Sequence, residues 1–209
     1  MTLSYTYDDS VMNAPQHRRT RDDVLVAAED LLAREGAQGL SVRRIADALG
    51  VSRQIVYSRF AGKPDLVRAL HTEGFGRLSA RFAAVPGPVG TTAHVLAMSQ
   101  AYRSSALASP ALYELMFGRP VAEFAPDDEA RAVAVEAFQP VVEAARSWLV
   151  SHTGSGTDAE ALGLALRVWA ATHGVVSLEA AGLLGEEAPA MVDDLVSAAL
   201  TAQLRDPRS

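Results

Sequence analysis

The chain of 209 residues contains no cysteine, which excludes a disulfide scaffold and thiolate catalysis. Aromatic residues make up only 6% of it, and no apolar run reaches the roughly 18 residues that a membrane-spanning helix needs. The N-terminal residues carry acids and tyrosines in place of the basic start and apolar core of a signal peptide. We therefore expect a soluble, cytoplasmic protein with no membrane partner.

Motifs typical of enzymes and metal proteins are also missing. The chain has no Gly-x-Ser-x-Gly elbow, no phosphate-binding glycine loop, no His-Glu-x-x-His and no zinc-ligand spacing. His94 and His173 are the only histidines that we expect deep in the C-terminal part, and they are too sparse for a metal site. We expect no catalysis, metal or cofactor, and an enzyme built on a helical bundle is the least favoured interpretation.

What the chain does contain is apolar residues, at 49%, with alanine and leucine recurring at helical spacing and little two-residue alternation. This predicts an all-α fold with three regions: a flexible arm over 1–16, a helix-turn-helix domain over 17–66, and a ligand-binding and dimerisation domain over 67–209. Gly36 and Gly39 end the first helix, and a fourth helix ends near Ala84. Later helices are expected over 91–109, 110–117, 127–152, 158–184 and 189–204. Pro140 should kink or divide the third of these later helices.

The segment over 41–60 predicts two short helices joined by a tight turn. Ser41 and Ser52 are suited to cap the two helices, and Gly50 permits a backbone conformation that is costly for other residues. Ala46 is small enough for the second helix to approach the first. The inward positions of the pair are Ile45, Leu49, Val51, Val56 and Phe60.

The outward positions of this segment carry groups that bind DNA. In a helix-turn-helix, the N-terminal residues of the second helix reach base edges in the major groove. Arg53 can pair with guanine and Gln54 with adenine. The remaining candidates, which we expect at phosphates or where the first helix crosses the DNA backbone, are Ser41, Arg43, Arg44, Ser52, Tyr57, Ser58, Arg59 and Lys63. The alternative is an ordinary helical corner with a solvated polar face.

Charge is segregated along the chain. Residues 41–63 hold five basic residues and one acidic residue, a net charge of +4, whereas residues 64–209 hold 10 basic and 17 acidic residues, a net charge of −7. A basic end on an acidic body suits a polyanionic partner at that end and repels it elsewhere. The alternative is that these basic residues cluster by chance on a solvated helix face.

Residues 21–70 resemble the DNA-binding domain of the tetracycline-repressor (TetR) family. The matching residues are Ala27-Ala28, Leu31-Leu32, Gly36, Gly39, the run from Ser41 to Ala46, Gly50-Val51-Ser52, Tyr57-x-x-Phe60 and Lys63-x-x-Leu66. The resemblance implies a three-helix DNA-binding domain, a connecting fourth helix and a C-terminal domain that dimerises and binds an effector. Arg59 departs from the usual histidine, and Ile55 stands where a small hydroxylated residue is frequent.

The C-terminal part is similar to a TetR subgroup named for a Trp-x-x-x-His-Gly signature, present here from Trp169 to Gly174. Candidate effector-binding residues are Met98, Tyr102, Tyr113, Met116, Phe117, Trp148, Trp169 and His173, with Phe124 and Phe138 as further apolar candidates. Plain core packing is the alternative for each. Candidate residues for a dimer interface, or for packing inside the subunit, are Leu162, Ala165, Leu166, Trp169, Val176, Leu195, Ala198, Ala199 and Ala202.

The sequence therefore predicts a ligand-responsive transcriptional regulator, most simply a repressor, that binds a palindromic operator in double-stranded DNA as a homodimer. A small-molecule effector of unknown identity releases it. The alternative is a helical small-molecule-binding or interaction module that does not bind DNA.

Overall fold

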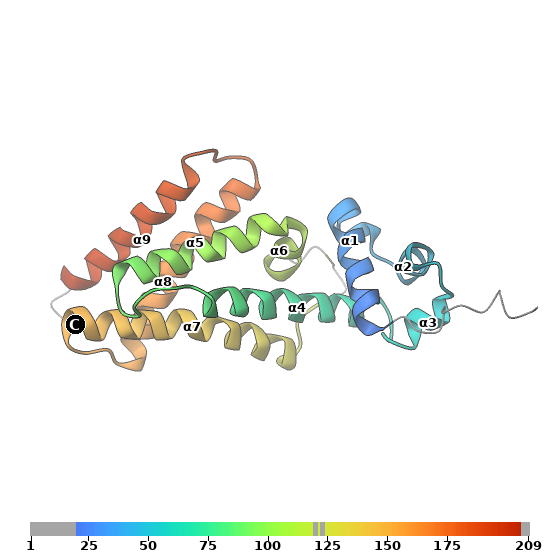
Figure 1. Cartoon of the computed structure of the whole chain (residues 1–209), viewed down its shortest axis with the longest axis horizontal. Helices are drawn as coiled ribbons and strands as arrows, with labels where there is room; N and C mark the ends of the chain where they lie inside the picture. The colour runs from blue at the N-terminus through green and yellow to red at the C-terminus, as the bar shows by residue number, and fades with distance from the viewer. Residues whose placement is uncertain (1–19, 119–120, 122–123, 206–209) are drawn as a thin grey trace, which may run out of the picture. The chain divides into compact units, whose positions relative to one another are not determined.

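The computed structural model describes residues 20–118, 121 and 124–205. Over these residues it is helical and contains no strand, which confirms the all-α prediction (Figure 1). The helices are α1 (Arg21–Gly39), α2 (Val42–Leu49), α3 (Arg53–Tyr57), α4 (Lys63–Ala83), α5 (Thr92–Ala108), α6 (Pro110–Phe117), α7 (Asp128–Thr153), α8 (Asp158–Ala180) and α9 (Ala188–Arg205). The arm over 1–16 and the basic residues 17–19 lie outside the described part.

The chain divides into two compact units, residues 1–69 and 70–209. In the first unit, α1 begins at a capping box in which Thr20 and Asp23 bond each other's backbone N–H groups. Gly36, at φ 66°, interrupts α1 before its last turn. The core of this unit is formed by Val24, Ala28, Leu31, Leu32, Ile45, Val56 and Phe60, all buried. The guanidinium of Arg21 lies 4.6 Å from the ring centre of Phe60, which it covers.

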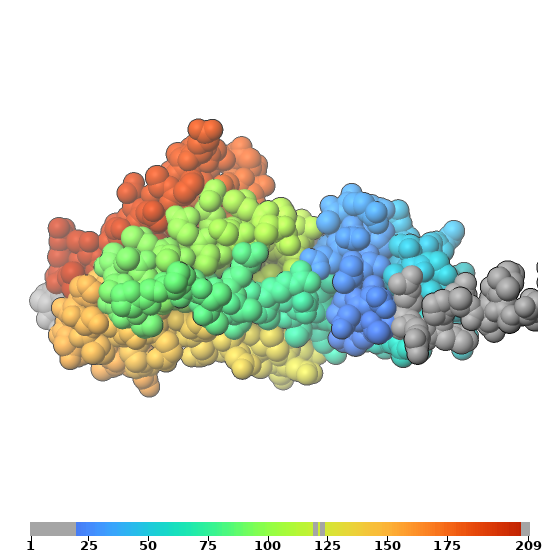
Figure 2. Space-filling view, viewed as in Figure 1, coloured from blue at the N-terminus to red at the C-terminus, as the bar shows by residue number. Residues whose placement is uncertain are grey.

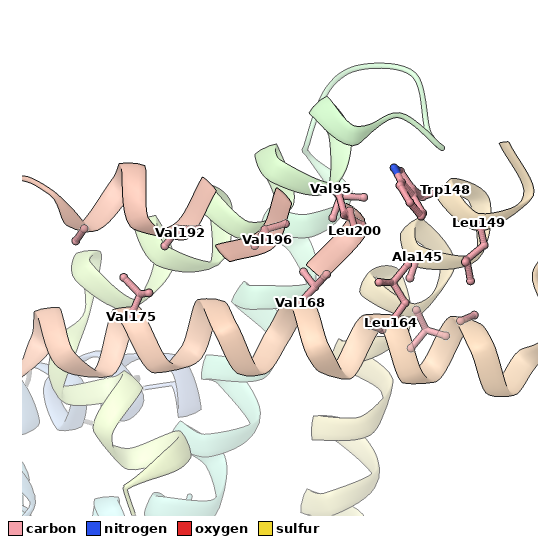
Figure 3. Packing of buried hydrophobic residues seen from close by; sticks show 14 residues of the cluster. Val95, Ala145, Trp148, Leu149, Leu164, Val168, Val175, Val192, Val196 and Leu200 are labelled. Atoms are coloured by element: carbon pink, nitrogen blue, oxygen red, sulfur yellow. The ribbon is translucent and has the colours of Figure 1, made fainter. Parts of the chain in front are cut away.

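The second unit contains two apolar clusters. In the first, α8 packs along α9, with α5 and α7 completing the cluster. Figure 3 shows Val168 and Val175 of α8 facing the row of Val192 and Val196 on α9, and Trp148 of α7 nearby. Because these side chains are almost fully buried, this cluster fixes α8 and α9 as a pair.

The second cluster joins α4 to the rest of the second unit. Figures 1 and 2 show α4 lying between α5 and α7. Phe75, Leu78 and Phe82 of α4 pack against Tyr102 of α5 and Ala137 of α7. The positions 75, 78 and 82 share one face of a helix, so α4 presents this face to α5 and α7.

The end of α8 differs from the sequence-based expectation, and of the two outcomes expected at Pro140, a kink or a division, the division does not occur. α8 ends at Ala180, not at 184, because Gly182 adopts a left-handed conformation (φ 72°) and Leu183 is 70% exposed. Pro140 does not divide α7, which continues to Thr153. The carbonyl left without its helical donor is that of Glu136, an exposed residue that water can reach.

α8 is long and apolar enough to cross a membrane by length and composition alone. In the structure, however, Ala161, Leu164, Ala165 and Val168 of this helix are buried in the first apolar cluster. A core helix of a soluble protein meets the same criterion, and we interpret α8 as such a helix.

Candidate nucleic-acid interface and ligand cavity

The predicted turn between two short helices is present in the first unit. The Ser41 hydroxyl accepts a hydrogen bond from the Arg44 backbone N–H at 3.3 Å and caps α2. Gly50 follows α2 in the left-handed conformation, with φ 64° and ψ 34°. Ser52 occupies the N-cap position of α3 but makes no side-chain capping bond. The Ser52 hydroxyl therefore remains available to an external acceptor.

The inner side of the pair is nearly as predicted. Ile45, Ala46, Val56 and Phe60 are each 1% exposed or less. Leu49 and Val51 are only half-buried. The two helices are thus held by a small core that leaves the opposite side of α3 uncovered.

The outer side of α3 carries Arg53, Gln54 and Tyr57, all exposed, and the Tyr57 side chain is 54% exposed. Tyrosine is enriched at interfaces, since its apolar ring ends in a hydroxyl that can form hydrogen bonds. The Ser58 hydroxyl donates to the Ile55 carbonyl at 2.7 Å, which engages its proton inside the protein. Ile55 is half-buried, so its apolar side chain helps to seat α3.

The predicted phosphate-binding cations are held by partners inside the chain. Arg44 forms an ion pair with Glu35 of α1 through two guanidinium nitrogens, and its side chain is 49% exposed. Arg43 lies 3.8 Å from Asp47 on the solvent side. The Lys63 ammonium donates to the Ala37 carbonyl at 3.3 Å, near the end of α1. These contacts hold the cations in place and leave part of each side chain exposed; Arg59 is also exposed.

The second unit contains a cavity of about 530 Å³, within the size range of small-molecule sites. Its walls come from α4 to α8 and the segment before α7. Four of the eight predicted effector-binding residues line it: Tyr102, Met116, Phe117 and Trp169. Phe124 and Phe138 line it as well.

The other four predicted residues are not among those that line this cavity. Met98 and Trp148 belong to the two apolar clusters. The Trp148 indole N–H donates to the Thr92 hydroxyl at 3.0 Å, and its ring stacks on His152 with centres 4.3 Å apart. These contacts indicate a packing role for Trp148.

Tyr113 and His173 belong to a hydrogen-bonded network beside the cavity. His173 Nδ1 lies 2.7 Å from the Tyr102 hydroxyl and 3.0 Å from the Tyr113 hydroxyl. Burial lowers the pKa of His173 below its usual value, so at neutral pH the ring is uncharged, and the tautomer sets whether Nδ1 donates or accepts in these contacts. The Tyr113 hydroxyl also lies 3.1 Å from Ser177. His173 thus matches the interpretation as a satisfied core histidine.

His71 is the residue that the sequence analysis missed: it is only 3% exposed and lines the cavity. Its Nδ1 is buried and has no hydrogen-bond partner among the described residues. The ring packs against Phe75, with centres 4.9 Å apart, and Phe124, at 5.6 Å. The signal was the helical spacing 71, 75, 78 and 82, which puts the histidine on the apolar face of α4.

Two family models match the chain. Residues 24–70 match the family described as bacterial regulatory proteins, tetR family, and residues 95–203 match the tetracyclin repressor-like C-terminal domain. Together they cover both units, and the second alone covers about half of the chain.

Individual proteins show the same likeness. The chain is 28% identical over 179 residues to Rv0681 of Mycobacterium tuberculosis, an uncharacterised HTH-type transcriptional regulator, and the match covers 85% of this chain and 78% of that protein. A solved structure from Rhodococcus sp. RHA1, of unknown function, is 28% identical with a TM-score of 0.71, covering 95% of this chain and 98% of that one. A TetR variant from Acinetobacter baumannii AYE in complex with minocycline is 17% identical with a TM-score of 0.60, covering 88% and 96%; this likeness is one of fold alone.

Proposed function

The chain belongs to the tetR family of bacterial regulatory proteins, and we propose that it is a ligand-responsive repressor that binds a palindromic operator as a homodimer. Family membership makes it a helix-turn-helix transcriptional regulator, and the finer statements are ours. We place it in the cytoplasm, with access to DNA, and assign it no catalytic activity.

The observation that carries the proposal is the outer side of α3. Arg53, Gln54 and Tyr57 are exposed there, while Val56 on the opposite side is fully buried. We assign Arg53 and Gln54 to base edges, because a guanidinium and an amide each bond a base in two places. Tyr57, Arg59 and Ser52 are assigned to phosphates, together with Lys63 and the cations of α2.

The homodimer is proposed to form through the outer faces of α8 and α9. Leu162 and Leu166 lie one helical turn apart on α8 and are 46% and 44% exposed; Leu195 of α9 is 43% exposed. Ala198 and Ala202 of α9 are exposed too, whereas Ala165 and Val176 are buried inside the subunit and leave the candidate interface. Exposed leucines on two paired helices suit a four-helix contact between two copies.

The cavity of the second unit is proposed to bind the effector. A related protein of the same fold is known in complex with minocycline, and the cavity here has the volume for a small molecule. Its walls include Phe75 and Phe82 of α4, the helix that begins at Lys63 in the first unit. An effector that binds more tightly to one position of α4 shifts the dimer toward that position and changes the spacing of the two recognition helices. Operator affinity then falls by the difference in effector binding energy between the two positions.

The test is a selection of genomic DNA fragments by the purified full-length protein. We expect enrichment of one palindromic site with half-sites about one helical turn apart. Arg53→Ala should enrich a site that is relaxed at the base pair Arg53 contacts, and Arg81→Ala, which removes an exposed arginine from the second unit, should enrich the unchanged site. No enriched site with the wild-type protein would refute the repressor and favour an interaction module without DNA binding.

A further inference from the structure

His71 gives the cavity a polar atom that nothing in the described structure satisfies. The side chain is 97% buried, and its Nδ1 has no hydrogen-bond partner there. A buried polar atom without a partner costs free energy, and such atoms are rare in folded proteins. His71 also lines the cavity of about 530 Å³ in the second unit. Because Nδ1 itself has almost no accessible surface, a ligand in that cavity supplies the missing bond when the imidazole turns to present a nitrogen to it.

The other polar groups around the cavity are already engaged. Tyr102 lines the cavity, but its hydroxyl lies 2.7 Å from His173 Nδ1. Arg131 is the one charged residue among the described lining residues, and its guanidinium bonds the Asp128 carboxylate at 2.6 Å and the Pro126 carbonyl. These contacts engage the Tyr102 hydroxyl and two nitrogens of Arg131, whereas the buried His71 Nδ1 has no partner among the described residues.

The charge state of His71 selects the chemistry of the ligand. Burial lowers the pKa of His71, and the Asp127 carboxylate opposes this only in part. The ring is therefore uncharged at neutral pH, with one nitrogen that donates and one that accepts. A hydroxyl group bonds either nitrogen, whereas a carboxylate requires a donor and loses its hydration on entering an apolar cavity.

The walls select the shape of the ligand. Phe75 and Phe117 lie edge to face with ring centres 5.5 Å apart, and Phe138 and Trp169 are tilted against each other with ring centres 5.6 Å apart. Offset and edge-on contacts of this kind extend readily to a further ring. The cavity volume of about 530 Å³ also exceeds what a one-ring compound fills, so a fused-ring compound is the better fit.

We propose that the cavity takes a neutral, fused-ring, mostly apolar molecule, and that His71 hydrogen-bonds its hydroxyl group. This rests on the proposed function in that the bound molecule is the effector. Since His71 lies on α4, eight residues after Lys63, this bond holds the ligand to the helix that continues into the DNA-binding unit.

The test measures ligand affinity in the absence of DNA. Three probes share one ring system and differ in a single group: 2-naphthol, 2-methylnaphthalene and 2-naphthoate. Equilibrium dialysis against the full-length protein should give the highest affinity for 2-naphthol and the lowest for 2-naphthoate. His71→Phe keeps an aromatic ring beside Phe75 and Phe124 but removes both nitrogens. It should weaken 2-naphthol binding about fivefold, the effect of one buried hydrogen bond, and leave 2-methylnaphthalene unchanged or tighter.

His94→Phe is the matched control. His94 is the other buried histidine whose Nδ1 has no partner among the described residues, and it is not among the residues that line the cavity. This variant should bind all three probes as the wild type does. His71→Gln, which restores a hydrogen-bonding group, should recover part of the preference for 2-naphthol and serves as the test if His71→Phe fails to fold.

Several results would overturn the inference. They are equal affinity of the wild type for 2-naphthol and 2-methylnaphthalene, tightest binding of 2-naphthoate, no binding of any probe, or unchanged 2-naphthol affinity in His71→Phe. If 2-naphthol binds through His71 but does not release the protein from an enriched operator, the proposed binding site is supported and its control of DNA binding is refuted. If the protein enriches no DNA at all, the proposed repressor function is refuted, and the probe affinities still decide whether His71 binds the ligand.

Discussion

Gly50 offers a direct check on the turn that sets α3 against α2. Its φ of 64° and ψ of 34° lie in the left-handed region, and a Cβ built on this residue meets no atom within 4 Å. The cost of Gly50→Ala is therefore that of the backbone conformation alone, roughly 1–2 kcal/mol. The smaller entropy of the unfolded alanine chain offsets about 0.4–1 kcal/mol of this. We expect a net loss of about 1 kcal/mol in the free energy of unfolding.

The assay is urea unfolding followed by far-ultraviolet circular dichroism, at one protomer concentration because oligomer stability depends on it. Gly76→Ala is the matched control: Gly76 lies exposed inside α4, its Cβ would also meet open space, and its φ is not positive. It should stabilise the protein by about 0.5–1 kcal/mol. Gly50→Asn should cost less than Gly50→Ala, because asparagine tolerates the left-handed region. Equal stabilisation by Gly50→Ala and Gly76→Ala would refute the left-handed turn.

Three further predictions test the second unit. Arg103 and Glu179 form a two-bond ion pair that is mostly buried, with side chains 18% and 12% exposed, so Glu179→Gln should destabilise by about 3 kcal/mol. Glu73→Gln, in an exposed pair with Arg77, should cost under about 0.5 kcal/mol in the same thermal unfolding experiment. Similar costs for the two variants would contradict this reasoning. Leu195→Glu should convert the dimer to a monomer in sedimentation velocity, whereas Leu107→Glu, at another exposed leucine, should leave it dimeric; a dimeric Leu195→Glu protein would exclude this face. Because burial lowers the pKa of His71 in the folded state, the unfolded state binds more protons below about pH 6.5, so stability should fall on acidification from about pH 8 to about pH 5.5. His71→Phe should show a shallower fall in melting temperature, and an identical fall would show that His71 does not titrate in this range.

Local features of the structure were predictable from the sequence, because neighbouring residues determine them. Ser41 caps α2, Gly50 is left-handed, and α6 spans Pro110–Phe117 as expected. Each depends on a cap, a turn glycine or a proline at a helix start, whose effects extend over only a few residues. Gly182 is likewise a glycine that can end a helix, but Leu183 and Leu184 after it continue the apolar pattern, so the pattern predicted a longer α8.

Contacts between distant residues were not predictable in this way. The residues Glu35 and Arg44, or Lys63 and Ala37, are paired by how α1 packs on its neighbours, not by spacing. The cavity is likewise formed by residues of five helices together. The sequence therefore does not distinguish an aromatic residue of the core, such as Trp148, from one that lines the cavity, such as Trp169. Only packing places Trp148 in the core and Trp169 at the cavity.

The measurement that tests the central proposal most directly is the affinity of Arg53→Ala for single-base variants of the enriched operator. If Arg53 reads a guanine, the wild type should lose tenfold or more when that base pair is changed in each half-site, a penalty of about 1–3 kcal/mol for each base pair. Arg53→Ala should bind the original and changed sites equally, and still discriminate at all other positions. Full discrimination by Arg53→Ala at every position would contradict the assignment of α3 as the base-reading helix.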